Sequence, residues 1–345
     1  MEKKIGVVVV GYGFMGTTHL ESWSSIPEAR ILGVVGRHKA KAQHIAKKYK
    51  VKVYPSLESA IKKREVDVVD ICTPTFTHCP LVVQAAEAGK HVFVEKPIAL
   101  TLRDADAMIK AAERSRVKFM VAHCLRFFPE YVKVKEIVSQ GTIGEPVMAR
   151  AHRSGPLPRW GRDNWFLDKS KSGGVAVDLA IHDVDFLRWC FSDEVRRVYA
   201  SVNRLVKKGG TSSDHALIIL RFKQDAIAHV EASWAVPDQA PFTTYFELAG
   251  TKGWLSVDNS SVVPVTVMSN GRVDRFSPDT MPWITGMPFP IDPYYRETRH
   301  FVDCIMKDEQ PVTGGREARS SLEVCLAALQ SANTQCPVDL PLGVK

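Results

Sequence analysis

Two groups of polar residues in this 345-residue chain have the types and spacing of catalytic groups. The first is Glu95-Lys96-Pro97, which follows the apolar run 91–94. That run predicts a strand, so the lysine is expected at a strand end, where it can bind a substrate hydroxyl or carbonyl. Partial removal from water lowers the pKa of an ammonium group and helps proton transfer. The alternative is a solvated lysine that only ends a strand.

The second group lies in the mostly apolar stretch 174–190, which predicts a helix. Asp178 and His182 are four residues apart and therefore share one face of a helix, with Asp185 on about the same side. Charged groups in a buried helix need partners. Asp178 could orient His182 as a general acid or base, both could bind a metal with Asp185, or they could form an internal hydrogen-bonded pair.

A glycine-rich turn near the N-terminus predicts a nucleotide site. The β-branched run 5–10 precedes it, a helical stretch follows, and a second apolar run spans 31–35. The turn consists of Gly11, Tyr12, Gly13, Phe14, Met15 and Gly16. The first glycine allows the bend, the second lets backbone approach a pyrophosphate, and the third brings the helix close to the strand. The N-terminus of that helix attracts phosphate. In this context the motif indicates a dinucleotide-binding domain.

The end of the second strand indicates which dinucleotide. NAD sites carry an acid about 20 residues past the glycines, where it binds the ribose 2′-OH. This chain has Gly36, followed by Arg37 and His38. A glycine leaves room, and an arginine can bind a 2′-phosphate. The pattern favours NADP(H) and leaves use of NAD(H) open. The alternative is that Arg37 is a solvated residue before a lysine-rich helix.

Other polar residues are expected around these groups. Thr73, Pro74, Thr75 and His78 follow the apolar run 67–72 and are expected at the edge of the cofactor. A pocket for a hydroxylated substrate could be lined by His123, Arg126, Arg153, Arg162 and Trp165. The loop 154–168 and the segment 277–296 are expected to shape that pocket. His19 is interpreted as a packing residue.

The order of elements predicts two domains of mixed α/β and α+β class. Residues 1–123 alternate strands (5–10, 31–35, 51–53, 67–72, 91–94, 117–122) with helices (17–25, 39–49, 56–63, 79–89, 102–115). This alternation predicts a parallel sheet covered by helices, as in a Rossmann domain. Residues 124–345 contain helices at 127–140, 294–307 and 314–332, besides 174–190. Period-two segments between 195 and 276 predict a large, mostly antiparallel sheet in this substrate-binding domain.

Composition and charge exclude several classes of protein. With 45% hydrophobic and 24% charged residues, the chain has the composition of a globular protein. Its net charge of +8 is spread along the sequence, so we expect no nucleic-acid partner. We expect no membrane span, no signal peptide and a cytoplasmic location. The seven cysteines are scattered without a C-x-x-C pair, which predicts reduced thiols.

Together these elements resemble the Gfo/Idh/MocA family, named after glucose–fructose oxidoreductase, inositol dehydrogenase and a rhizopine-catabolism protein. The resemblance covers nearly the whole chain. The most specific motif is Glu95-Lys96-Pro97 followed by Gly173-Gly174 and the pair Asp178 and His182. Further matching residues are Gly11–Gly16 with His19, Thr73-Pro74 with His78, and Arg126-Phe127 with Pro129.

The resemblance implies an activity and roles for these residues. Family members transfer a hydride between nicotinamide and a secondary alcohol or carbonyl of a sugar, polyol or inositol, without a metal. The catalytic residues fall on Lys96, Asp178 and His182, which also contact the substrate. Glu95 and Lys96 lie beside the cofactor, and the Lys96-Pro97 peptide is often cis. Gly36-Arg37 departs from the acid common in NAD-type members and matches the NADP-using branch.

The resemblance also implies a homodimer or homotetramer formed through the open face of the C-terminal sheet. Two other functions are compatible with the same fold. One is a glycosidase that uses a tightly bound NAD for transient oxidation, and the other is a nucleotide-sensing regulator without catalysis. The presence of Lys96 and His182 disfavours both.

Overall fold

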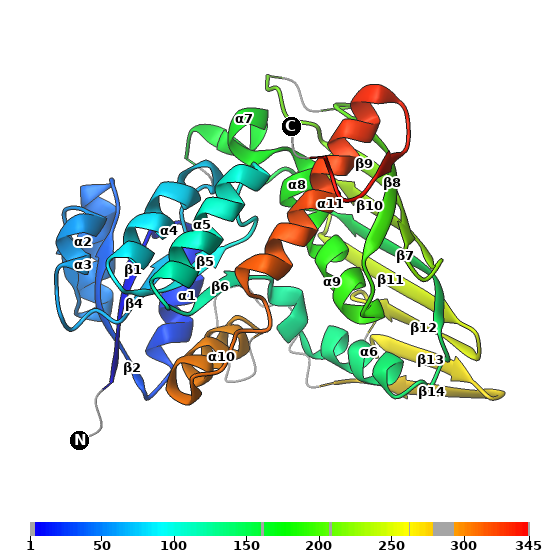
Figure 1. Cartoon of the computed structure of the whole chain (residues 1–345), viewed down its shortest axis with the longest axis horizontal. Coiled ribbons are helices and arrows are strands. Elements are labelled where there is room, and N and C mark those ends of the chain that lie inside the picture. Colours follow the sequence, from blue (N-terminus) through cyan, green and yellow to red (C-terminus); the bar gives the residue numbers. More distant parts are fainter. Residues whose placement is uncertain (1–3, 160–161, 207–208, 262, 279–292, 344–345) are drawn as a thin grey trace. The chain divides into compact units, whose positions relative to one another are not determined.

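The structure is a computed structural model. It describes residues 4–159, 162–206, 209–261, 263–278 and 293–343. The chain divides into two compact units (Figure 1). Unit 1 comprises Met1–Cys124 and Met281–Arg319, and unit 2 comprises Leu125–Thr280 and Ser320–Lys345. The division at residues 123 and 124 that the sequence suggested stays a prediction about domain organisation.

Unit 1 contains a parallel sheet with the strand order of a dinucleotide-binding domain. Its described strands run in the order β3-β2-β1-β4-β5-β6, and every adjacent pair is parallel. The strands are β1 (Ile5–Val10), β2 (Ala29–Val35), β3 (Lys52–Tyr54), β4 (Val68–Ile71), β5 (His91–Glu95) and β6 (Phe119–Ala122). Because the order reverses beside β1, the loops after β1 and β4 diverge at the carboxyl edge, where such sheets bind ligands.

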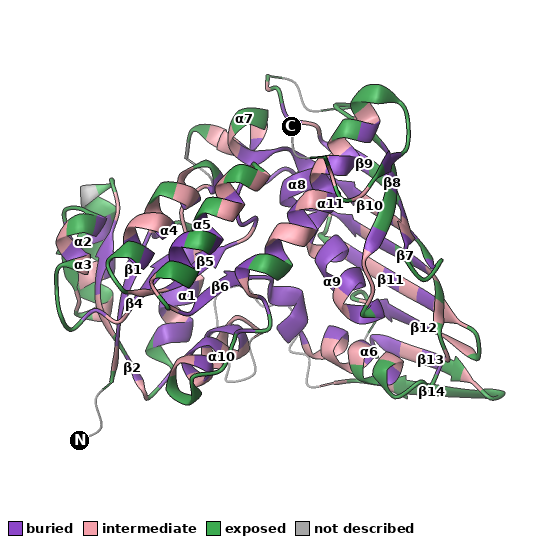
Figure 2. Ribbon diagram, viewed as in Figure 1, coloured by how far each residue is buried: buried purple, intermediate pink, exposed green. Residues whose placement is uncertain are grey.

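Five described helices follow or connect these strands, and a sixth, α10, joins the unit from a later part of the chain. They are α1 (Phe14–Ser24), α2 (Lys39–Tyr49), α3 (Leu57–Ile61), α4 (His78–Glu87), α5 (Leu102–Arg114) and α10 (Pro293–Lys307). Thr101 caps α5 by accepting a hydrogen bond from the backbone N–H of Asp104. The buried side of α5 is apolar, whereas its other side is exposed (Figure 2). The apolar strands β1, β4 and β5 are buried throughout or nearly so, which makes them the core of the unit.

Unit 2 contains a second, mostly antiparallel sheet. Its described strands run in the order β14-β13-β12-β11-β7-β10-β9-β8-β15. They are β7 (Pro146–Ser154), β8 (Val195–Asn203), β9 (His215–Phe222), β10 (Ile227–Ser233), β11 (Thr243–Gly250), β12 (Gly253–Asp258), β13 (Val265–Ser269), β14 (Arg272–Phe276) and β15 (Val338–Asp339). Among the described pairs in this sheet, β7 with β10 is parallel and the others are antiparallel.

The strands of unit 2 bury one face and expose the other. Along β9, Ile218 and Leu220 are buried, whereas Leu217 and Ile219 between them are exposed. Helices and short 3-10 turns complete the description: η1 (Thr75–Thr77), η2 (Cys124–Phe127), α6 (Pro129–Ser139), η3 (Arg162–Leu167), α7 (Lys169–Ser172), α8 (Val175–Asp178), α9 (Ile181–Phe191) and α11 (Gly315–Thr334). No described helix combines the length and the apolar character of a membrane span.

The predicted fold class is confirmed, and three features differ from the sequence analysis. The predicted helix 174–190 is two helices, α8 and α9. Strands β14 and β15 were not predicted. Strand β7, near the middle of its sheet, was not predicted either, because its buried face consists largely of the small residues Ala149 and Ala151. Alanine gives little of the β-branched or aromatic signal by which strands are recognised.

A pair of methionine substitutions tests the core of unit 1. Met108 in α5 is fully buried, whereas Met306 in α10 is 56% exposed. We expect Met108→Ala to lower the free energy of unfolding by about 2–5 kcal/mol, because it leaves a cavity. Met306→Ala is the matched control, with a change within about 0.5 kcal/mol. Urea unfolding measures both, and equal losses would contradict the described packing of α5.

Candidate active site

The glycine turn after β1 has the shape that close approach of a ligand requires. Gly11 has a φ of +90°, and a Cβ at that position would lie 2.6 Å from the carbonyl oxygen of Cys72. A Cβ at Gly16 would lie 2.2 Å from the carbonyl oxygen of Gly11, so α1 packs on the turn because Gly16 has no side chain. Nothing lies within 4 Å of a Cβ at Gly13. This open backbone between two constrained glycines fits a dinucleotide pyrophosphate.

Helix α1 adds a favourable site for an anion at the same turn. Its N-cap is Gly13, which has no side chain to accept hydrogen bonds from the N–H groups of the first turn. These N–H groups and the helix dipole together favour phosphate. Phe14 is exposed and Met15 is half-buried at the start of the helix.

The end of β2 differs in one respect from the sequence-based expectation. Gly36 was expected to leave room, but the ring of Tyr12 occupies that space. A Cβ at Gly36 would lie 2.3 Å from Cε1 of Tyr12. Arg37 and His38 are exposed, and His38 caps α2 by accepting a hydrogen bond from the N–H of Lys41 at 3.2 Å. Arg37 is therefore available to bind a ligand at this edge of the sheet, whereas the space beside Gly36 is filled by the ring of Tyr12.

His78 connects the loops that follow β4 and β5. Its Nε2 lies 2.8 Å from the carbonyl oxygen of Thr73, and its Nδ1 lies 3.0 Å from that of Pro97. Burial lowers the pKa of His78. A neutral imidazole has one N–H and therefore donates to one of these oxygens. Thr75 is buried and Pro74 is half-buried in the same loop.

Lys96 follows β5 directly and is half-buried, beside the buried Glu95. The carboxylate of Glu95 accepts a hydrogen bond from the backbone N–H of Lys96 at 3.1 Å. The Lys96-Pro97 peptide bond is cis, as the family resemblance implied. Since β5 is parallel to β4, Lys96 and Thr73 both lie at the carboxyl edge of the sheet. The structure therefore brings the predicted cofactor residues and the predicted catalytic lysine to one edge of unit 1.

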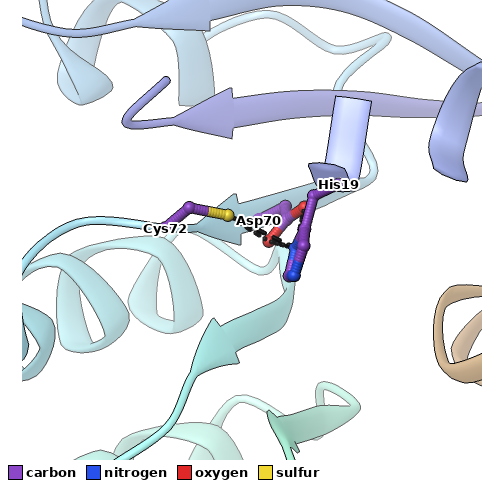
Figure 3. A group of neighbouring side chains, drawn as sticks. All are labelled: His19, Asp70 and Cys72. Carbon is purple, nitrogen blue, oxygen red and sulfur yellow. Dashed lines mark hydrogen bonds and ion pairs between the residues drawn. The ribbon is translucent and has the colours of Figure 1, made fainter. Parts of the chain in front are cut away.

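The carboxylate of Asp70 holds two residues of α1 to the end of β4. His19 Nδ1 lies 3.0 Å from Oδ2 of Asp70, and Trp23 Nε1 donates to the same oxygen at 2.7 Å. Cys72 Sγ lies 3.3 Å from His19 Nδ1 (Figure 3). His19 was predicted as a packing residue, whereas Asp70 was not predicted from the sequence. Its only signal in the sequence was a charge inside an apolar strand.

The same histidine connects this cluster to β5. His19 Nε2 lies 3.1 Å from Oε1 of Glu95, in an ion pair without the alignment of a hydrogen bond. Its ring stacks on Phe93, with centroids 5.1 Å apart. Burial opposes the charged form, but the carboxylate of Asp70 outweighs it and raises the pKa of His19 well above its usual range. The raised pKa favours the charged form of His19, whose ring lies between the carboxylates of Asp70 and Glu95.

The cluster also meets the distance criterion for a metal site. Ligand atoms of His19, Asp70 and Cys72 lie within 4.8 Å of one another. However, Asp70 already pairs with His19 and Trp23, and burial raises the pKa of the Cys72 thiol, which disfavours the thiolate that binds metals. A network of hydrogen bonds and ion pairs accounts for all these groups, so we interpret it as structural.

In unit 2, Asp178 and His182 lie on separate short helices. Asp178 is the last residue of α8, and His182 is the second residue of α9. The backbone N–H of Ala180 donates to Val175 and that of His182 donates to Leu179, so the α-helical pattern breaks between them. Asp178 is buried and His182 is half-buried. The relative position of Asp178 and His182 is therefore set by the break between α8 and α9, and not by the four-residue spacing of a single helix.

Two glycines shape the turn before α8. Gly173 and Gly174 both have a φ of +75°, a conformation that disfavours other residues. A Cβ at Gly174 would also lie 2.6 Å from Oγ of Ser213. The turn that leads to Asp178 therefore requires glycine for conformation and for space.

Two buried arginine–aspartate pairs hold the N-terminal half of α9. Arg153 in β7 binds Asp183 through Nε at 2.8 Å and Nη2 at 2.9 Å. Arg126 in η2 binds Asp185 through Nε and Nη2, each at 2.8 Å. Burial lowers the pKa of Arg153, but Asp183 outweighs it and raises that pKa overall. Both arginines were predicted as substrate contacts, and the structure places their guanidinium groups on the two aspartates that follow His182 in α9.

The remaining predicted pocket residues are not brought together by the described contacts. His123 is buried at the end of unit 1's last parallel strand, where its N–H donates to Val121. Trp165 stacks on Phe166 in unit 2, with centroids 4.0 Å apart. The side chain of Arg162 and most of the segment 277–296 lie outside the described residues. In the loop 154–168, Asp163 and Asn164 both have positive φ.

Family comparisons match both units. The profile of the oxidoreductase family with an NAD-binding Rossmann fold, GFO_IDH_MocA, matches residues 5–123. The profile of the GFO/IDH/MocA C-terminal domain matches residues 131–256.

Individual relatives match over nearly the full chain. The chain is 30% identical to myo-inositol 2-dehydrogenase of Thermotoga maritima over 338 residues, which cover 96% of this chain and 97% of the relative. It is 28% identical to scyllo-inositol 2-dehydrogenase (NAD(+)) of Bacillus subtilis, with coverage of 99% and 97%. Among solved structures, GenD2 from gentamicin A biosynthesis in complex with NAD has a TM-score of 0.87 and 26% identity, with coverage of 99% and 98%.

A substitution at Asp70 tests the buried charge of His19. We expect Asp70→Asn to destabilise the protein by about 3–5 kcal/mol near pH 6, because it leaves the imidazolium without its main counter-charge. The raised pKa of His19 stabilises the folded state fully below about pH 6.5, and that contribution is lost as the pH rises through the folded-state pKa. The difference in the free energy of unfolding between wild type and Asp70→Asn should therefore become smaller as the pH rises.

Urea unfolding of both proteins between pH 6 and pH 10 measures this difference. Asp106→Asn is a control, because Asp106 pairs with Arg319 at a partly exposed site. A stability difference for Asp70→Asn that stays constant across the range would contradict an ionised His19.

Proposed function

The chain belongs to the Gfo/Idh/MocA family of oxidoreductases, and from this premise we propose that it is an NADP(H)-dependent dehydrogenase or reductase of a sugar, polyol or inositol. The observation that carries the proposal is the edge of unit 1 where the glycine turn and Lys96 lie together. The two relatives named above are inositol 2-dehydrogenases.

We assign the chemistry to three residues. A bound nicotinamide accepts or returns the hydride, and the chain must handle the proton and the developing charge on oxygen. His182, half-buried at the start of α9, takes the hydroxyl proton during oxidation. Lys96 binds the reacting oxygen with its ammonium group. Asp178, buried at the end of α8, binds the substrate and orients the histidine.

Further contacts to the substrate are proposed from His123, Arg126, Arg153 and Trp165. Many hydroxyl groups need several donors and acceptors, and guanidinium groups supply donors in a fixed plane. In the structure, both arginines also bind aspartates that follow His182 within α9. They are therefore proposed to hold the histidine as well as the substrate. The pocket segment 154–168 stays a prediction, as does the cytoplasmic location.

The preference for NADP(H) is proposed from the end of β2. Gly36 stands where an NAD-type site carries an acid, and the exposed Arg37 follows it. A guanidinium can bind a 2′-phosphate through paired hydrogen bonds. The Bacillus subtilis relative is named for NAD(+), and the similar structure of GenD2 is a complex with NAD, so the chain is also proposed to accept NAD(H) with lower affinity.

A homodimer or homotetramer is proposed through the open face of the unit 2 sheet. Tyr199 on β8 and Ile219 on β9 are exposed and directly paired in register, and Leu217 and Ile227 are exposed nearby. Arg150 on β7 pairs with Glu247 on β11 at 3.1 Å on the same sheet. Apolar side chains beside charged pairs form a face that a second copy of the chain can cover.

Two alanine variants test the proposed activity. Purified protein is mixed with a panel of sugars, inositols, their keto forms and nucleotide sugars, and nicotinamide absorbance is followed with NADP(H) and NAD(H). We expect Lys96→Ala and His182→Ala each to lower turnover by about 10²–10⁴-fold, because each removes a group that acts on the proton or the oxygen. His44→Ala, at an exposed site on α2, is the control.

Cofactor binding of the same variants separates chemistry from folding. His182→Ala should bind the cofactor as the wild type does, since the proposed cofactor groups belong to unit 1. Full turnover by both alanine variants would refute the assigned mechanism. Cofactor binding without turnover of any substrate in the wild type would instead favour the bound-cofactor glycosidase or the regulator.

The cofactor preference is tested at Arg37. We expect Arg37→Ala to raise the KM for NADP(H) about 10–100-fold, the effect of losing a charged hydrogen bond, with little change for NAD(H). Steady-state kinetics with both cofactors measures the change. An equal effect on both cofactors would place Arg37 outside the 2′-phosphate site.

A further inference from the structure

The loops after β1 and β2 lie side by side at the edge of the sheet. Val10, the last residue of β1, is paired with Val35, the last residue of β2. The N–H of Gly11 donates to the carbonyl oxygen of Val35 at 2.8 Å. Tyr12 in the glycine turn is thereby placed next to Gly36, the position that selects between the two dinucleotides.

Tyr12 and Gly36 form an interlocked pair. A Cβ at Gly36 would lie 2.3 Å from Cε1, 2.5 Å from Cζ and 2.8 Å from the hydroxyl oxygen of Tyr12. Gly36 has no positive φ, so the backbone itself does not require glycine there. The residue is glycine because the tyrosine ring occupies the space of a side chain.

The ring of Tyr12 is held in this place. Tyr12 is 5% exposed. Its hydroxyl donates to the carbonyl oxygen of His38 at 3.0 Å and accepts from the N–H of His38 at 3.0 Å. A side chain at position 36 could enter only if the ring moved, which would break both hydrogen bonds. The same two bonds fix the turn that carries Arg37 and leads into α2.

We propose that Tyr12 determines cofactor specificity, by excluding an acid from position 36 and by holding the turn that presents Arg37. An NAD-type site needs a carboxylate at the end of this strand to bind the ribose 2′-OH. In this chain a carboxylate at that position requires the tyrosine ring to leave its place and to give up both hydrogen bonds to His38. The inference rests on the proposed use of NADP(H), and it adds that selection depends on two positions together rather than on the glycine alone.

The test compares four proteins: wild type, Tyr12→Ala, Gly36→Asp and the double variant. Titration calorimetry gives the Kd of each for NADPH and NADH. We expect Gly36→Asp alone to weaken NADPH at least about tenfold without tightening NADH, because the carboxylate meets the ring. The double variant should bind NADH at least about tenfold more tightly than Gly36→Asp does.

Tyr12→Phe and Tyr54→Phe form a matched pair of controls. Both tyrosines are buried in unit 1, but the ring of Tyr54 packs on Gly33 within β2 rather than on the turn. Loss of the Tyr12 hydroxyl should weaken NADPH more than NADH, whereas loss of the Tyr54 hydroxyl should leave the ratio of the two Kd values unchanged. An unchanged ratio for Tyr12→Phe would contradict the role in presenting Arg37.

The outcomes separate this inference from the proposed function. A wild type that prefers NADH refutes the proposed NADP(H) preference, while the coupling between positions 12 and 36 is still measured by the four proteins. Equal NADH affinity of Gly36→Asp and the double variant overturns the inference. If Gly36→Asp does not fold, Gly36→Ala is compared with Tyr12→Ala/Gly36→Ala by thermal unfolding. The Tm penalty of the alanine should vanish in the Tyr12→Ala background, and an equal penalty in both backgrounds overturns the pairing.

Discussion

The buried carboxylate of Asp70 is the interaction on which the nucleotide half of the protein depends. An ionised group in the interior is costly unless its charge and its hydrogen-bonding capacity are satisfied. Asp70 meets both needs with His19 and Trp23 from α1. It therefore fixes the helix that begins at the glycine turn to the strand that leads to Thr73. His19 extends the same link to Glu95, beside the backbone of Lys96.

Unit 2 uses buried charge in a comparable way. Arg153 with Asp183 and Arg126 with Asp185 form two bidentate pairs on α9, one and three residues after His182. Each pair joins α9 to a different element, β7 or η2. Removal of one partner would leave an uncompensated buried charge, so the N-terminal half of α9 is held firmly. His182, the proposed general base, is the second residue of α9. The two arginine–aspartate pairs therefore hold the part of the helix that carries it.

Close packing at two glycines, Gly16 and Gly36, links the fold of unit 1 to the proposed preference for NADP(H). A side chain at Gly16 would clash with the carbonyl oxygen of Gly11, whereas a side chain at Gly36 would clash with the ring of Tyr12. The first is a general feature of a helix that packs closely on a strand. The second depends on the identity of Tyr12, a position that the dinucleotide fingerprint leaves free. The specificity that we propose for this chain therefore involves a residue that the motif does not define.

The sequence alone determined the parallel sheet of unit 1 and predicted the chemistry of its edge. Buried parallel strands are continuous apolar runs, and the glycine spacing reports a backbone requirement, so both can be recognised locally. Only the tertiary structure decided which charges meet: the partners of Asp70, Arg126 and Arg153 are separated from them by 30 to 59 residues of sequence. It also decided that α8 and α9 are separate, that β7 lies inside its sheet, and that Tyr12 fills the space beside Gly36. These features depend on contacts between distant segments, which local composition and periodicity do not contain.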